Sequence, residues 1–192
     1  MADELEDQIE AAEEAGDIPK LFTIISTCAK HGGDEDYETA TEGSLDSLYW
    51  LVKSGSAFSI DVLGQIFATL EAWTGEEAIV EVALGCIVAI ASKRAELSDK
   101  EQNVDVNLII DVMQSYEGES TIQEQACLAI EGLANSSSVL KNNLRDIEVI
   151  RDELIAAKGR ITNERNKKYP GLAMAALGIE LWEGSWGFIF RT

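Results

Sequence analysis

The residues best able to do chemistry surround the only histidine of the chain. His31 stands just before the acidic turn residues Asp34, Glu35 and Asp36. Histidine and carboxylates occur together in metal sites, but a second nitrogen or sulfur ligand at a recognised spacing is missing. Cys28 precedes His31 by three residues, yet its place on an apolar stripe favours core packing over nucleophilic catalysis. We therefore expect a solvated acidic turn with no metal ligand, no cofactor and no catalytic residue.

The charge of the chain excludes several classes of partner. The 192 residues include 35 Asp and Glu but only 15 Lys and Arg, which gives a net charge of −20. Phosphate contacts draw on Lys and Arg, so we expect no nucleic-acid binding. The longest apolar stretch, Ala78 to Ala91, contains Glu81 and is too short to span a bilayer, so we also expect no membrane insertion. No glycine-rich phosphate loop followed by lysine occurs.

The start of the chain and its cysteines bear on the compartment. Four of the first seven residues are acidic, and this stretch lacks the basic and apolar regions of a secretory signal. The three cysteines, Cys28, Cys86 and Cys127, are an odd number in apolar surroundings, which is typical of free buried thiols. These features predict a reducing intracellular compartment, the cytoplasm.

Hydrophobic residues recur with the period of a helix rather than that of a strand. Two long apolar stripes consist of Leu63, Ile66, Phe67 and Leu70, and of Ile109, Ile110, Met113 and Tyr116. Two stripes rich in small residues consist of Ala83, Ile87, Ile90 and Ala91, and of Ala126, Ile130, Leu133 and Ala134. The pattern predicts an all-α fold.

The stripes also repeat at a fixed offset of 43 residues. This offset relates Ile66, Phe67 and Leu70 to Ile109, Ile110 and Met113, and it relates every member of the first small-residue stripe to a member of the second. Related spacings extend the pattern in both directions. We therefore predict a repeat domain over 17–181, with units near 17–57, 58–104, 105–146 and 147–181, each pairing an apolar helix with a small-residue helix. Residues 1–16 are either an acidic arm or a helix that caps the first unit, and 182–192 form an aromatic tail.

Turn residues are expected to mark the ends of these helices. Gly75, Gly118 and Gly159, like Gly32 and Gly33, fall where a left-handed residue would stop the long helix of each unit. Thr121 to Glu124 has the spacing of a capping box. Pro170 is expected to start the last small-residue helix, and Asp17 to mark the boundary before the first.

The third unit resembles an armadillo repeat. The characteristic part is the run from Gln123 to Ala134, with Ala126, Cys127 and Ile130 in the armadillo positions. The second unit is similar but degraded, and the other two match only by spacing. The resemblance implies a right-handed α-solenoid of about four short repeats whose concave face binds other proteins. HEAT repeats have nearly the same period and remain an alternative.

Armadillo proteins that import nuclear cargo bind peptides through Trp and Asn residues one turn apart on the concave helices. The matching positions are Gly85 and Ala89 in the second unit, Leu128 and Gly132 in the third, and Asp46 and Trp50 in the first. The ladder is absent, so the resemblance does not imply an import function. Trp50 and Trp73 are expected in the core of their helices, although Trp50 at a ladder position could instead face the concave groove.

Charge is distributed unevenly along the chain. Residues 1–140 contain 28 acids and 6 bases, whereas residues 141–168 contain 5 acids and 8 bases. The acidic residues that we select as a candidate surface are Asp34, Glu35, Asp36, Glu38, Glu42 and Asp46. Three interpretations stay open: a merely solvated surface, a surface that meets a basic partner, and head-to-tail contact between copies.

The last residues gather aromatic side chains, namely Trp182, Trp186, Phe188 and Phe190. They either fold back over the last repeat or form an exposed anchor for a partner, since Trp and Phe are common at interface hot spots. Trp50 is a further candidate anchor.

Together these features predict a non-enzymatic scaffold or adaptor that binds a protein through an acidic solenoid surface, the aromatic tail, or both. One alternative is a structural subunit built permanently into a larger complex. A less favoured alternative is an enzyme whose metal or cofactor the sequence does not indicate.

Overall fold

The computed structural model describes residues 2–31, 34–55, 61–93, 97 and 101–180. These residues form ten α-helices and one short 3₁₀ helix, with no strand among them, so the all-α prediction is confirmed. The elements are α1 (Ala2–Ala15), α2 (Ile18–Cys28), η1 (Ala29–His31), α3 (Glu35–Ser54), α4 (Val62–Ala72), α5 (Glu77–Lys93), α6 (Asn107–Ser115), α7 (Ser120–Ser136), α8 (Ser138–Arg145), α9 (Ile150–Arg160) and α10 (Tyr169–Leu177).

The helices belong to two compact units, Met1–Asp105 and Val106–Thr192. The division falls where the sequence places the boundary between the second and third helical units. Acids and bases number 23 and 6 in the first unit, which gives a net charge of −17. They number 12 and 9 in the second, which gives −3. Nearly all of the excess charge therefore belongs to unit 1.

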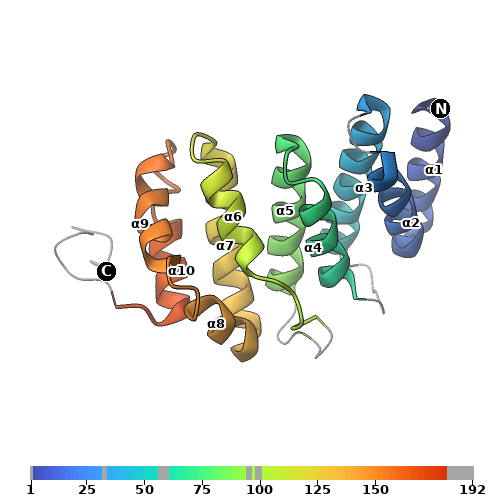
Figure 1. Cartoon of the computed structure of the whole chain (residues 1–192). Coiled ribbons are helices and arrows are strands. Elements are labelled where there is room, and N and C mark those ends of the chain that lie inside the picture. Colours follow the sequence, from blue (N-terminus) through green and yellow to red (C-terminus); the bar gives the residue numbers. More distant parts are fainter. Residues whose placement is uncertain (1, 32–33, 56–60, 94–96, 98–100, 181–192) are drawn as a thin grey trace. The chain divides into compact units, whose positions relative to one another are not determined.

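In unit 1, α3 is the central helix and packs against α1, α2 and α5, while α4 packs against α5 (Figure 1). The apolar stripes of these helices meet in the core, where Leu21, Leu45, Leu48 and Ile66 are fully buried. Burial of each such side chain contributes about 1.5–3 kcal/mol to folding. The core thus fixes which face of α3 remains at the surface.

In unit 2, α7 is the central helix and packs against α6, α8, α9 and α10 (Figure 1). Ile130, Leu140, Leu154 and Met174 fill the space between these helices. Small residues on α7 and α10, including Ala126 and Ala173, are fully buried, which allows the two helix axes to approach closely.

The offset of 43 residues is reproduced by the helices themselves. The 17-residue helix α5 begins at Glu77 and the 17-residue helix α7 begins at Ser120. Ala83 and Ala126 are buried to the same extent at matching positions, as are Ile87 and Ile130. The helices α5 and α7 are therefore alike in length and in the burial of these matching positions.

The sequence predicted the first residues of helices better than their last residues. Asp17 caps α2 by accepting a hydrogen bond from the Lys20 amide, and Pro170 lies in the first turn of α10, both as expected. Thr121 does not begin a capping box, because α7 starts one residue earlier and its N-cap Glu119 makes no side-chain cap bond.

The predicted glycine stops are wrong at three positions. Among the described glycines, left-handed φ angles occur at Gly16, Gly55 and Gly178. Gly159 lies inside α9, and the ends of α4 and α6 are capped by Trp73 and Tyr116 before Gly75 and Gly118 are reached. The first-unit stop, Gly32 and Gly33, lies outside the described residues.

The first residues form a helix rather than an arm. The apolar residues Ile9 and Ala12 on one side of α1 are buried against α2 and α3. Its other faces carry acidic side chains such as Glu10 and Glu14. This helix therefore brings a second set of carboxylates to α3.

Candidate interaction surface

Trp50 is the most exposed large hydrophobic residue of the described chain, with 60% of its surface accessible. The expectation that it lies in the core is wrong, whereas Trp73 is buried as expected. Trp50 follows Asp46 by four residues and Glu42 by eight, so it shares their side of α3 instead of the side that bears Leu45 and Leu48. The spacing alone could have indicated this exposure.

The ring of Trp50 belongs to a small aromatic and cationic group. Tyr49 lies edge-on to Trp50 with ring centroids 5.5 Å apart. The Lys53 Nζ lies 4.8 Å from the Tyr49 centroid and 5.7 Å from the Trp50 centroid, and donates a 2.7 Å hydrogen bond to the Tyr49 hydroxyl. This part of α3 thus already holds a cation against aromatic rings.

The predicted acidic residues all lie on α3 or at its start. Asp34 is the N-cap and accepts a hydrogen bond from the Asp36 amide, while Glu35 is exposed in the first turn. Glu38 and Glu42 are half-buried. Acidic residues at a helix N-terminus interact favourably with its dipole, so the first of these have a structural role of their own.

The later acidic residues of α3 meet carboxylates from neighbouring helices. Burial raises the pKa of Asp46, and the nearby charge of Glu13 on α1 raises it further. Burial likewise raises the pKa of Glu81 on α5, with added repulsion from Glu77 and Glu42. Both shifts mean that the ionised forms are destabilised by their surroundings.

We call the five residues Glu13, Glu42, Asp46, Glu77 and Glu81 the carboxylate face. They come from α1, α3 and α5 of unit 1. Glu13 accepts a 2.6 Å hydrogen bond from the Ser47 hydroxyl. Within the described part of the chain, no lysine or arginine forms an ion pair with any of the five. The sequence indicated Glu42 and Asp46, but Glu13, Glu77 and Glu81 were missed because only the packing brings them there.

Two hollows lie between α1 and α3. The first, of about 350 Å³, has Ile9, Ala40 and Gly43 on its apolar side and Glu6, Glu10 and Asp36 among its polar lining. The second, of about 580 Å³, is lined by Glu10, Glu13, Glu14, Trp50, Leu51 and Ser54. Glu10 belongs to both, so the hollows adjoin each other along the two helices.

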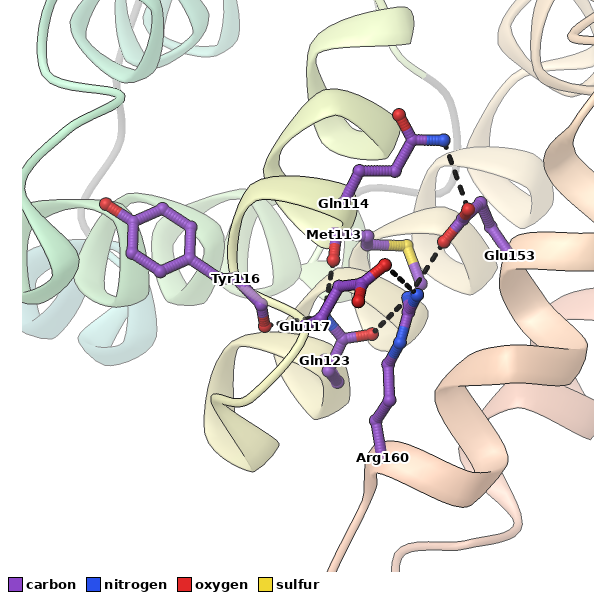
Figure 2. A network of polar contacts seen from close by, with 7 residues as sticks. All are labelled: Met113, Gln114, Tyr116, Glu117, Gln123, Glu153 and Arg160. Atoms are coloured by element: carbon purple, nitrogen blue, oxygen red, sulfur yellow. Dashed lines mark hydrogen bonds and ion pairs between the residues drawn. The ribbon is translucent and has the colours of Figure 1, made fainter.

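Unit 2 instead satisfies its polar groups internally. Gln123 on α7 is fully buried, and its amide nitrogen donates to the carbonyl oxygens of Met113 and Tyr116 at the end of α6, at 2.8 and 2.9 Å. The Arg160 guanidinium pairs with Glu153 at 2.8 Å and with Glu117 at 2.6 Å, as Figure 2 shows. These contacts join the end of α6 to α7 and α9. The pairing of Arg160 with Glu117 spans 43 residues, so local patterns do not predict it.

Two lysines of unit 2 interact with side chains of the same unit. Lys167 pairs with Glu164, and Lys168 lies 5.8 Å from the Tyr169 ring centroid. Burial raises the pKa of Glu131 on α7, and the charge of Lys168 opposes that shift.

The structure shows no functional arrangement, within the described residues, around His31, the other residue that the sequence singled out for chemistry. His31 is exposed and stacks on Tyr37 with ring centroids 4.5 Å apart. Within the described residues, no group of three or more His, Cys, Asp or Glu side chains could hold a metal ion. The aromatic candidates Trp182, Trp186, Phe188 and Phe190 lie outside the described residues.

The cysteines are free and buried, as the sequence predicted. The Cys86 thiol donates to the Leu45 carbonyl at 3.3 Å, and burial raises the pKa of Cys86, Cys127 and Cys28. None of the helices that the structure describes combines the length and hydropathy needed to cross a bilayer.

No protein-family model, no curated protein and no solved structure matches this chain. Its function therefore has to be inferred from its own residues and contacts.

Proposed function

We propose that this protein is a non-enzymatic interaction module that binds a basic protein partner through the carboxylate face of unit 1. The observation that supports it best is the gathering of carboxylates from three helices with no ion-paired lysine or arginine among the described residues. Such an arrangement costs folding free energy, and a cationic partner would recover that cost on binding.

The helix pairs of the two units support an armadillo-like architecture as part of this proposal. The equal lengths of α5 and α7, their offset of 43 residues and their matched burial are features expected of repeats. In the proposed right-handed solenoid, α3, α5, α7 and α10 are the helices that carry the small residues. The partner would use the surface of α3 and α5.

The test is cross-linking capture from the native source with two quadruple variants of equal charge. One carries Glu42→Gln, Asp46→Asn, Glu77→Gln and Glu81→Gln in unit 1. The matched control carries Asp111→Asn, Glu119→Gln, Asp146→Asn and Glu148→Gln at exposed positions of unit 2. We expect a basic partner to be recovered with the wild type and the control but lost with the first variant.

A second readout uses salt. The association rate constant of the recovered partner should fall on the order of tenfold between 50 and 300 mM salt, because added salt shortens the range of electrostatic attraction. The dissociation rate constant should change less. Equal capture by both variants, together with an association rate indifferent to salt, would contradict the proposal.

A further inference from the structure

The helices α1 and α3 run in the same direction. A Cβ placed on Gly43 would lie 3.8 Å from the Ile9 Cδ1, and four residues later on both helices Glu13 and Ser47 are hydrogen-bonded. The C-terminal ends of both helices therefore lie at the same end of the groove. This is the end that contains Glu14, Trp50 and Ser54.

Three features favour the binding of a cation in the second hollow. Glu10, Glu13 and Glu14 of α1 line it, and no lysine or arginine is among its lining residues in the described chain. The two helix C-termini add the negative ends of their dipoles. The charge of Glu13 already contributes to the raised pKa of Asp46, so the local potential is negative.

The exposed ring of Trp50 determines which cation fits best. Lys53 approaches the aromatic pair but does not line the hollow, so the hollow itself is open to a ligand. A guanidinium is flat, stacks on an indole ring and can form two parallel hydrogen bonds to a carboxylate. A lysine ammonium can do neither the stacking nor the paired bonding as well.

We propose that the hollow between Trp50 and α1 binds an arginine side chain from a basic segment of the partner. The rest of the segment lies along the first hollow, with further cations near Glu6 and Asp36 and small side chains over Gly43. This inference rests on the proposed function. It specifies the part of unit 1 that the partner contacts and the side chain that the partner must provide.

The experiment measures binding of a fluorescent peptide of alternating glycine and arginine to the full chain by anisotropy. Versions with lysine or with citrulline, the neutral isostere of arginine, test the charge and the flat guanidinium separately. We expect Trp50→Ala to weaken arginine-peptide binding about tenfold, and Trp50→Phe to retain part of it. Glu14→Gln should weaken binding about threefold. The matched control is Ile155→Ala, an exposed apolar residue of α9.

A spectroscopic readout locates the peptide. The indole N–H signal of Trp50 should shift on peptide addition, and that of the buried Trp73 should not. Circular dichroism of each variant shows whether it is folded, which is expected because Trp50 and Glu14 are exposed.

Equal binding by wild type and Trp50→Ala would overturn the inference, as would equal affinity for the arginine and lysine peptides. Failure of the arginine peptide to bind the wild type would also overturn it. In each of these cases the proposed function still stands if the unit 1 quadruple variant loses the cross-linked basic partner while the unit 2 variant keeps it.

Discussion

The helices α5 and α7 have the same length and begin 43 residues apart, yet the carboxylates at one matching position have opposite surroundings. Glu81 on α5 faces the like charges of Glu77 and Glu42. Its counterpart on α7, Glu124, accepts hydrogen bonds from Asn166 at 2.7 Å and from Ser120 at 3.3 Å. Unit 2 thus provides Glu124 with hydrogen-bond donors of its own, whereas Glu81 in unit 1 has like charges beside it. Under the proposed function, a cationic partner supplies the missing positive charge.

This difference indicates that the shared packing of the two units does not dictate their surfaces. A set of like charges that weakens folding and has no structural counterpart in the equivalent unit is more consistent with binding than with stability. Substitutions in one unit at a time test whether this difference is real. Buried Cys86 in unit 1 and buried Cys127 in unit 2 allow each unit to be followed separately by thiol labelling.

The largest effect is expected from Gln123→Leu in unit 2. The substitution keeps the volume but leaves the Met113 and Tyr116 carbonyls without their side-chain donor, and Arg160 loses an acceptor. We expect a loss of about 2–3 kcal/mol in the free energy of unfolding. Urea unfolding measures it, and labelling of Cys127 should accelerate more than labelling of Cys86.

Gln125→Ala on the same helix is the control, because the side chain of Gln125 makes no hydrogen bond within the described residues. Equal destabilisation by the two substitutions would show that the buried amide network does not stabilise unit 2.

A smaller effect should follow from acidification. Because the folded-state pKa values of Asp46 and Glu81 are raised, the native state binds more protons than the unfolded state as the pH falls through them. The penalty of ionisation is therefore present at pH 7 and disappears toward pH 4. Labelling of Cys86, normalised to its rate in urea at the same pH, should therefore slow as the pH falls from 7 toward 4.

Labelling of Cys127 should change less over the same range, since Lys168 opposes the shift at Glu131. A faster reaction at Cys86 in acid would contradict the predicted sign.

The smallest expected effect on the free energy of unfolding comes from single substitutions on α5 and α7. Glu81→Gln removes a carboxylate flanked by like charges, so we expect it to stabilise the protein by up to about 0.5 kcal/mol at pH 7 and low salt. Glu131→Gln removes a carboxylate whose burial penalty is offset in part by the charge of Lys168, so it should bring a smaller gain. Thermal melts at two salt concentrations measure both, and equal gains would remove the contrast.

The sequence predicted the helices well because helical periodicity is a local signal, and the 43-residue offset repeats that signal along the chain. It predicted helix ends poorly, since Trp73 and Tyr116 end their helices without any left-handed residue at the following glycines. Glycine thus marked the loops but not the last helical residue.

The candidate surface was only partly predictable for a related reason. Glu42, Asp46 and Trp50 share one side of a helix, which the spacing reveals. The approach of Glu13 and Glu81 to that side depends on how α1 and α5 pack against α3. The pairing of Arg160 with Glu117 likewise joins residues distant in sequence that local patterns do not relate.

The most direct test of the central claim is a carbon-detected NMR titration of the Asp and Glu carboxyl groups in the full chain. The account predicts that Asp46 and Glu81 titrate above the ordinary values of about 3.9 and 4.3, and that an arginine-rich peptide lowers both. Titration of both groups at or below those values in the free protein would contradict it, because the carboxylate face would then already be compensated.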